Sequence, residues 1–176
     1  AGLVSIANKP VRSPPAGRLG PTLGWPRAHP VGWGIAQALH DAGAEVGFSS
    51  IESLIEKRVK PLADSIGSTF VEPCDVQVDA DIDRVFGRWA ETHDGLDILV
   101  HALAYAKRED LEGEFVNTSR EGFALALDVS AYSLVAVTRH ALPVLKPGAS
   151  ILTLNYYDAE EVVANSNREG AAQSGL

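Results

Sequence analysis

From Val31 onward the chain alternates between short apolar runs and longer amphipathic stretches, and this alternation constrains its fold more than any other feature. The apolar residues of the longer stretches recur at helical spacing. Strands that alternate with helices predict an α/β fold: a doubly wound parallel sheet, covered by helices, with right-handed crossovers. We expect strands at residues 3–6, 45–48, 69–73, 96–101 and 150–154, and helices at residues 34–42, 51–66, 79–92 and 132–145.

Glycine and proline mark the expected ends of these elements. Gly43 and Gly67 follow the first two helices, where a left-handed residue commonly ends a helix. Pro61 should kink or divide the second helix. The last two strands should be buried on both faces. The expected apolar stripes are Ile35, Ala38 and Leu39 in the first helix, and Ile82, Val85, Phe86 and Trp89 in the third.

Composition excludes several classes of protein. The 176 residues carry a formal net charge of -8, which argues against nucleic acid as a partner. No apolar run approaches the roughly 18 residues that span a bilayer, so we expect no membrane segment. The lone cysteine, Cys74, excludes a disulfide scaffold and favours a reducing, cytoplasmic compartment.

The segment 10–30 interrupts the regular pattern. It holds six of the ten prolines and has no apolar periodicity, so we expect an irregular loop. A disordered insertion is the simpler interpretation, and an interaction loop is the alternative. We therefore expect residues 1–176 to form one domain with a proline-rich insertion at 10–30.

Ligands of open parallel sheets bind beyond the carboxyl ends of the strands. Gly32-Trp33-Gly34 opens the first helix and could cradle a pyrophosphate, although such a pair is more often a tight turn. Asp75 could accept from a ligand amine or cap the following helix. His101 fits best as a hydrogen-bonded core residue. Tyr156 could donate to an acid or oxyanion step, or simply pack. We expect no metal site.

Several motifs together resemble the NADH-dependent enoyl-(acyl carrier protein) reductases, a divergent branch of the short-chain dehydrogenase/reductases. The resemblance covers about residues 31–165 and also residues 3–9. It implies a Rossmann-like, dinucleotide-binding fold and an oxidoreductase of fatty-acid synthesis. The motifs are Val31-Gly-Trp-Gly-Ile-Ala-Gln-Ala-Leu-His40, Cys74-Asp-Val76, Thr118-Ser-Arg-Glu-Gly-Phe123, Asp128-Val-Ser-Ala-Tyr-Ser133 and Ser150-Ile-Leu-Thr-Leu154.

The resemblance implies hydride transfer from NADH to the β-carbon of a trans-2-enoyl thioester, carried by acyl carrier protein or coenzyme A. A tyrosine hydroxyl would stabilise the enolate, a lysine would hold the nicotinamide ribose, and the enzyme would be a homotetramer. Matched by position, the cofactor would contact Val31 at the pyrophosphate, Asp75 and Val76 at the adenine and Leu103 at the nicotinamide-side ribose. Ala106 would contact substrate, and Tyr156 matches the first active-site tyrosine.

This sequence departs from the family pattern at its most important positions. Ser166 stands at the place of the essential tyrosine and Gln173 at the place of the lysine, with the spacing between them kept. An alkanol is much less acidic than a phenol, and a neutral amide lowers no pKa by charge. Loss of such a donor costs roughly 10²–10⁴ in rate.

Other departures concern the cofactor loop and the end of the chain. The first motif lacks its strand-ending glycine, the insertion at 10–30 splits the phosphate loop, and Ile51 replaces an expected glutamine. We also expect a C-terminally truncated domain, without the last strands and the helices that cover the substrate. An impaired reductase is therefore the first hypothesis. A non-catalytic dinucleotide-binding or subunit-pairing module is the second, and an incomplete gene product is the third.

Overall fold

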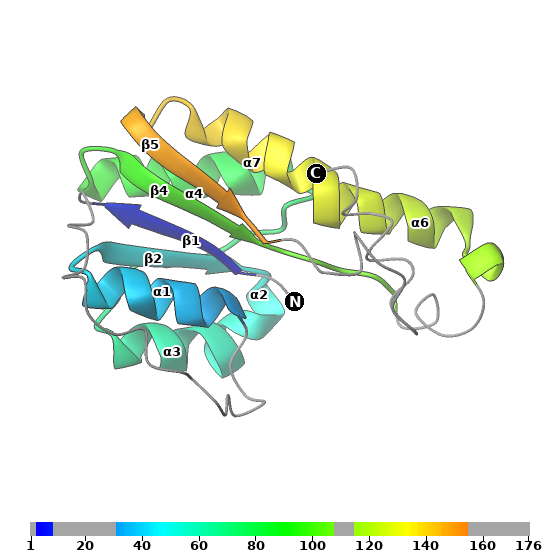
Figure 1. The fold of residues 1–176 in the computed structure, drawn as a ribbon, viewed down its shortest axis with the longest axis horizontal. Helices are drawn as coiled ribbons and strands as arrows, with labels where there is room; N and C mark the ends of the chain where they lie inside the picture. Colours follow the sequence, from blue (N-terminus) through cyan, green and yellow to red (C-terminus); the bar gives the residue numbers. More distant parts are fainter. Residues whose placement is uncertain (1–2, 9–30, 108–114, 155–176) are drawn as a thin grey trace, which may run out of the picture.

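The computed structural model describes residues 3–8, 31–107 and 115–154, which form a five-stranded sheet covered by helices (Figure 1). The strands lie in the order β3-β2-β1-β4-β5. Four of them, β2 to β5, run in one direction, so the predicted α/β fold is confirmed. The strands span Leu3–Asn8 (β1), Glu45–Ser50 (β2), Val71–Pro73 (β3), Leu96–Ala102 (β4) and Leu145–Thr153 (β5).

The first strand runs against the others, because β1 pairs antiparallel with both β2 and β4. Leu3 lies beside the end of β4, and Asn8 lies beside Glu45 at the start of β2. The expectation of a wholly parallel sheet is therefore wrong at β1. Parallel pairing of β1 with β2 requires α1 to cross back over the sheet between them, and a short link from β1 to α1 would force that arrangement. The connection here, residues 9–30, is long enough to recross a strand of about 20 Å.

Nine helical segments follow or separate these strands in the described ranges. The expected third helix is confirmed at both ends, as α4, and its four predicted apolar residues are all buried. The segments are α1 (Val31–Asp41), α2 (Glu52–Leu54), the π-helix η1 (Ile55–Val59), α3 (Lys60–Ser65), α4 (Asp79–Thr92), the 3₁₀ turn η2 (Phe115–Asn117), α6 (Arg120–Leu127), the π-helix η3 (Asp128–Tyr132) and α7 (Ser133–Ala141).

Two hydrophobic cores, one on each face of the sheet, make the fold doubly wound. On one face α4 and α7 pack against β4, with Trp89 and Leu99 in the core. On the other face α1 and α3 pack against β2, with Ala36 and Phe48 in the core. Successive residues of β4 divide between the two, since Leu99 belongs to the first core and Ile98 packs against the second.

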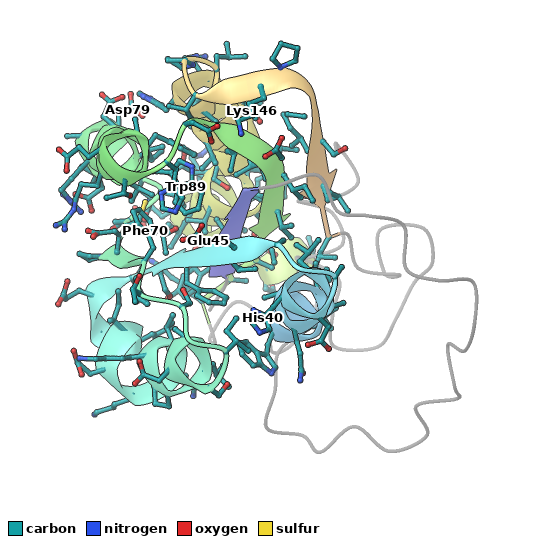
Figure 2. All side chains as sticks on the ribbon, turned by 90° about the vertical axis from the view of Figure 1, so that its left-hand side faces the viewer. His40, Glu45, Phe70, Asp79, Trp89 and Lys146 are labelled. Carbon is teal, nitrogen blue, oxygen red and sulfur yellow. The ribbon has the colours of Figure 1, made fainter. Side chains whose placement is uncertain are left out.

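Trp89 is the largest fully buried side chain of the described residues. Its indole N–H donates to the carbonyl of Gly95 at 3.0 Å. The ring meets Phe70 edge-on, with centroids 5.0 Å apart, and stacks on His93 with centroids 3.6 Å apart. Figure 2 shows Phe70 and Trp89 side by side below α4. Because Phe70 precedes β3 and Trp89 belongs to α4, these contacts fix the helix over the edge of the sheet.

The predicted glycine stops are confirmed. Gly43 and Gly67 adopt φ of 91° and 68°, which a residue with a Cβ rarely does. After α1, the N–H groups of Gly43 and Ala44 donate to the carbonyls of His40 and Leu39. The N–H groups of Gly67 and Ser68 cap α3 in the same way. Both helices therefore end with their last carbonyls paired.

The first two helices differ from their predicted form. In α1 the buried residues are Gly32, Trp33 and Ala36, whereas Ala38, expected on the core face, is exposed. The helix begins at Val31, earlier than predicted, and its core face is the one that carries Trp33 and Ala36. The expected second helix is divided into α2, η1 and α3, and Pro61 occupies the first turn of α3, in agreement with its predicted effect.

The helix predicted at residues 132–145 is longer and begins earlier. α6, η3 and α7 run on without a break, and Leu145 already belongs to β5. By length and composition alone, the helix Arg120–Ala141 could cross a membrane, so the expectation that no segment qualifies is wrong. A helix from the core of a globular protein passes the same test. About a third of its most apolar window is buried, and the buried part packs on α4 and the sheet.

β5 was expected to be buried on both faces, and it is not. Ile151 and Leu152 are each 42% exposed. Within the described residues β5 pairs only with β4 and therefore forms one edge of the sheet. A strand with one neighbour keeps part of its apolar surface in water. The apolar run of residues 150–154 was read correctly as a strand, but its position in the sheet was not.

Candidate functional site

A cavity of about 290 Å³ lies at the carboxyl ends of β2, β3 and β4, and we call it the carboxyl-edge cavity. Three walls enclose it: the turns that follow β2 and β3, the segment that leaves β4, and the helix formed by α6 and η3. This is the edge at which ligands of α/β sheets bind. The lining residues are Ile51, Cys74, Asp75, Val76, Gln77, Leu103, Ala104, Tyr105, Leu125 and Val129.

The turn after β3 presents Asp75 and Val76 to the cavity. The backbone N–H of Asp75 donates to Asp81 Oδ2 at 3.0 Å, and Asp75 Oδ1 accepts from the N–H of Gln77 at 3.0 Å. Asp75 thus closes a turn onto Gln77 and does not cap α4, whose N-cap residue is Val78. Of the two roles considered for Asp75, the cap is wrong. A carboxylate has more acceptor capacity than one such bond uses.

Asp81 holds that turn from the first turn of α4. Arg84 donates to Asp81 Oδ1 and also to the carbonyl of Pro73 at 2.8 Å. The hydrogen bond from Arg84, followed by the backbone N–H of Asp75, holds the pKa of Asp81 below its usual value. The carboxylate is therefore charged at neutral pH, when it can accept from Asp75. The wall of the cavity is tied to α4 by this pair.

Two side-chain bridges join the other walls. Gln77 Nε2 donates to Asp128 Oδ2 at 2.8 Å, which links the turn after β3 to η3. The hydroxyl of Ser130, also on η3, accepts from the N–H of Tyr105 at 3.0 Å. η3 therefore contacts both flanking walls, and it contributes Val129 to the lining itself.

Cys74 lines the cavity but is chemically inert. It is 6% exposed, and burial raises the pKa of its thiol to about 12, with Asp81 adding to the effect. A thiol in that state is not a nucleophile near neutral pH. Its role is packing, since it belongs to the same core as Trp89.

His101 is a hydrogen-bonded core residue, as predicted. It is 1% exposed, and burial lowers its pKa to about 4. The Ser133 hydroxyl donates to the carbonyl of Val129 at 2.6 Å, so it accepts from His101 Nε2 at 2.7 Å. His101 Nδ1 then accepts from Thr153 at 3.2 Å. The neutral imidazole ties β4 to β5 and α7.

The chemistry of the lining suits a flat heteroaromatic ring with an amine. Ile51, Val76 and Leu103 offer apolar surface, and Asp75 offers an acceptor. In the described part of the chain no three histidine, cysteine, aspartate or glutamate residues gather as metal ligands.

The structure brings together only some of the residues singled out from the sequence. Asp75, Val76 and Leu103 line one cavity, together with Ile51. Val31 opens α1 and is 69% exposed, and Ala106 follows the lining segment. Neither belongs to the described lining. The catalytic positions Tyr156, Ser166 and Gln173 lie outside the described residues.

The expected turn between the first strand and the first helix is not at this site. Because β1 is reversed, Asn8 ends it at the opposite edge, beside the start of β2. Gly32-Trp33-Gly34 lie within the first turn of α1, and not in a loop before it. α1 leads directly into β2 along the face of the sheet, so only its beginning lies at the carboxyl edge (Figure 1).

Sequence reasoning missed the contribution of the helix. Leu125 and Val129 lie far along the chain from Asp75, and no local pattern joins them to it. Their spacing of four residues was an available signal, because it places both on one helical face. Gln77 follows Val76 in the turn after β3, and Tyr105 precedes Ala106 in the segment after β4. Both therefore reach the cavity together with residues that the sequence analysis had named.

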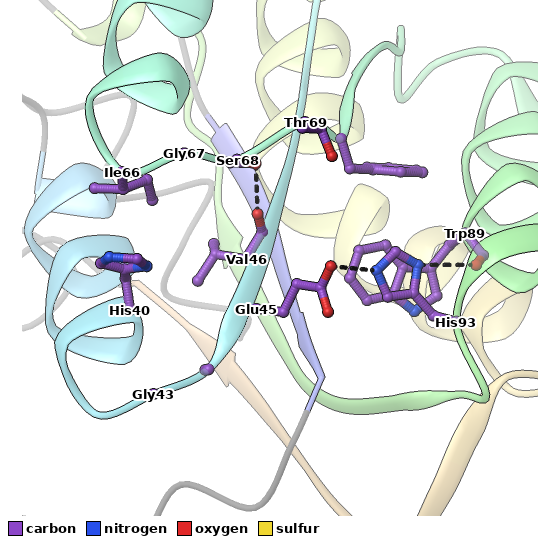
Figure 3. A pocket seen from close by; sticks show the side chains of 12 residues that line it. His40, Gly43, Glu45, Val46, Ile66, Gly67, Ser68, Thr69, Trp89 and His93 are labelled. Atoms are coloured by element: carbon purple, nitrogen blue, oxygen red, sulfur yellow. Dashed lines mark hydrogen bonds and ion pairs between the residues drawn. The ribbon is translucent and has the colours of Figure 1, made fainter.

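A second hollow, of about 270 Å³, lies at the opposite, amino edge of the sheet (Figure 3). Three of its polar groups already bond within the fold. His93 Nε2 faces Glu45 Oε1 at 3.2 Å, while Nδ1 lies 3.2 Å from the carbonyl of Trp89. The Ser68 hydroxyl donates to the carbonyl of Val46 at 2.6 Å. These contacts join the ends of α3 and α4 to the start of β2.

Comparison with known proteins agrees with the geometry. The family model for enoyl-(acyl carrier protein) reductase matches residues 26–176. An NADH-dependent enoyl-(acyl carrier protein) reductase of Aquifex aeolicus is 42% identical over 147 residues, which cover 83% of this chain and 54% of that protein. A reductase of the same name from Rhizobium meliloti is 40% identical over 91% of this chain and 59% of its own length.

Solved structures give the same result. The crystal structure of the Aquifex aeolicus enzyme superimposes with a TM-score of 0.79, covering 83% of this chain and 58% of that one. The enzyme of Anaplasma phagocytophilum, solved in complex with NAD, gives a TM-score of 0.80 at 38% identity, covering 87% of this chain and 59% of that one. The chain thus spans little more than half the length of these relatives.

Proposed function

Because the chain belongs to the enoyl-(acyl carrier protein) reductase family, we propose that it binds NADH in the carboxyl-edge cavity. The observation that carries this proposal is the cavity itself: apolar walls with a carboxylate acceptor at the carboxyl ends of three strands. At about 290 Å³, it is near the lower bound of roughly 300 Å³ for small-molecule sites, which suits one half of a dinucleotide.

The proposed cofactor contacts follow the shape of the cavity. Asp75 accepts from the exocyclic amine of the adenine, and Val76 covers one side of the ring. Leu103 lies toward the nicotinamide-side ribose. The backbone N–H groups at the start of α1, from Val31, face the pyrophosphate, because the N-terminus of a helix favours an anion. Ala106 leaves room for the substrate.

We propose that the reaction is reduction of a trans-2-enoyl thioester of acyl carrier protein or coenzyme A. Bound NADH supplies the hydride, which the β-carbon accepts, while the thioester oxygen becomes an enolate and the α-carbon then takes a proton. Tyr156 is the proposed donor to that oxygen. Ser166 and Gln173 replace the tyrosine and lysine expected there, so turnover is lower than in the family by roughly 10²–10⁴.

A non-catalytic role is the second candidate, and the same two residues favour it. A chain that holds NADH but lacks both the phenol and the ammonium group would act as a dinucleotide-binding or subunit-pairing module. We further propose that residues 1–176 act as one domain with an insertion at 10–30, located in the cytoplasm, without nucleic-acid or membrane partners.

Self-association is proposed from the outer face of α7 and its neighbours. Tyr132, Val135 and Leu142 are 48%, 50% and 63% exposed, which is unusual for large apolar side chains on one helical segment. A homo-oligomer, a tetramer as in the family, would cover them. Val135→Glu should shift the mass measured by light scattering toward the monomer. An unchanged mass would contradict this interface, and partition of the wild type into vesicles would favour a membrane role for Arg120–Ala141.

The function is tested by titrating the purified chain with NADH and following its fluorescence, then adding a crotonyl thioester and following NADH oxidation. Binding with slow turnover supports the impaired reductase, and the double variant Ser166→Tyr/Gln173→Lys should then raise the rate. Binding without turnover, in both proteins, supports the non-catalytic module. Absence of binding contradicts both.

A further inference from the structure

The hydroxyl of Ser130 makes two hydrogen bonds to the backbone of Tyr105, which lies far away in the sequence. Its oxygen accepts from the N–H of Tyr105 at 3.0 Å and donates to the carbonyl of Tyr105 at 3.3 Å. Ser130 is 0% exposed, so water does not compete for either bond. One buried side chain therefore engages both polar backbone groups of one residue in the wall of the carboxyl-edge cavity.

The segment that Ser130 contacts lies outside the helices and strands, so no regular hydrogen-bond pattern fixes its backbone. β4 ends at Ala102, and Leu103–Lys107 form neither helix nor strand. Leu103, Ala104 and Tyr105 nevertheless line the cavity. Backbone groups outside a helix or sheet need partners from side chains or water. Ser130 supplies such partners at the middle of the wall.

Ser130 lies in the π-helical turn η3. A serine inside a regular helix usually returns its hydroxyl to a carbonyl one turn earlier, as Ser133 does with Val129 at 2.6 Å. Ser130 instead bonds across to Tyr105. π-helical turns widen a helix locally and occur often at functional sites. The same turn contributes Val129 to the lining, and Asp128 to the bridge with Gln77.

We propose that Ser130 is a positioning residue for the nucleotide site: it fixes the Leu103–Tyr105 wall at the distance that the cofactor requires. The proposal rests on the proposed binding of NADH in this cavity. Ser130 does not line the cavity itself, so its effect on binding passes through the backbone of Tyr105. Without the hydroxyl, this backbone would lose its buried partner and the wall would move.

The test compares Ser130→Ala with Ser133→Ala. The two serines are equally buried and lie on the same helix, but Ser133 bonds to His101 and not to the wall. Circular dichroism first checks that both variants fold like the wild type. Two quantities are then measured: the Kd for NADH, and the rate of hydrogen–deuterium exchange of the Tyr105 amide. We expect Ser130→Ala to weaken NADH binding about tenfold and to speed this exchange. Ser133→Ala should leave the Kd within about twofold of wild type.

Equal losses of affinity in the two variants, or a wild-type Kd in Ser130→Ala, would overturn the proposal. If the wild type itself failed to bind NADH, the proposed function would be wrong, and amide exchange alone would decide whether Ser130 anchors the wall. If Ser130→Ala did not fold, Tyr105→Pro would remove the N–H that donates to Ser130. The Tyr105 side chain is exposed, so replacing it leaves the core intact. Tyr105→Pro should weaken binding more than Tyr105→Ala, which keeps the N–H, and equal effects of these two would also overturn the proposal.

Discussion

The most informative stability measurement concerns His101, whose protonation should destabilise the folded state. Its ring is 1% exposed, it receives a hydrogen bond from Thr153 at Nδ1, and burial lowers its pKa to about 4. In the unfolded chain the pKa returns to about 6.5. Below pH 6.5 the unfolded state therefore binds a proton at His101 that the folded state does not bind. The free energy of unfolding decreases as the pH falls toward 4.

The size of this effect follows from the two pKa values. The free energy of unfolding decreases by about 3 kcal/mol once the pH is below the folded-state value, and by about 2 kcal/mol between pH 7.5 and pH 5.0. His101 is one of five histidines in the chain. The contribution of His101 must therefore be isolated by a variant.

His101→Gln serves that purpose, because an amide can donate to Ser133 and accept from Thr153 without titrating. Urea unfolding of both proteins at pH 7.5 and pH 5.0 gives four free energies. The wild type should lose about 2 kcal/mol more than the variant between the two pH values. If both proteins lose the same amount, His101 takes up its proton while folded, and the account of a neutral, buried imidazole is wrong.

Three further predictions concern the core and the helix ends. Trp89→Phe should lower the free energy of unfolding by about 3 kcal/mol in urea, because the carbonyl of Gly95 loses its donor and a void remains; a loss below about 1 kcal/mol would contradict this packing. Gly43→Ala should destabilise by about 1 kcal/mol, since φ is 91°, whereas Gly87→Ala in the middle of α4 meets open space and should stabilise by about 0.5–1 kcal/mol; effects of the same sign would be inconsistent with these backbones. Cys74 should react with an aromatic disulfide at pH 8 only as fast as the protein unfolds, and rapid labelling of the folded chain would show that the thiol is not buried.

Local signals in the sequence were sufficient for elements whose stability is local. α4 was predicted at Asp79–Thr92 because its apolar residues keep one helical face. Gly43 and Gly67 were predicted as helix ends because few other residues adopt a positive φ. Each of these features depends on a few neighbouring residues.

The errors concern relations between distant segments. The direction of β1 depends on its pairing with β2 and β4, and no pattern within Leu3–Asn8 encodes it. The exposure of Ile151 depends on whether another strand covers β5. In α1 the core face carries Trp33 and Ala36, and the local apolar pattern assigned Ala38 to the wrong face.

The candidate site divides in the same way. Asp75, Val76 and Leu103 follow strands, and parallel strands deliver their ends to one edge, so these residues do meet in one cavity. Leu125, Val129 and the hydrogen bonds between Ser130 and Tyr105 depend on the packing of a distant helix. Only the three-dimensional arrangement reveals them.

The central claim is that NADH binds in the carboxyl-edge cavity, and a fluorescence titration of three proteins tests it most directly. Val129→Trp fills the cavity from η3, whereas Glu91→Trp adds the same ring to the exposed surface of α4. We expect the wild type and Glu91→Trp to bind NADH with the same Kd, and Val129→Trp to bind at least about tenfold more weakly. Equal affinity in all three proteins would place the cofactor elsewhere and contradict the account.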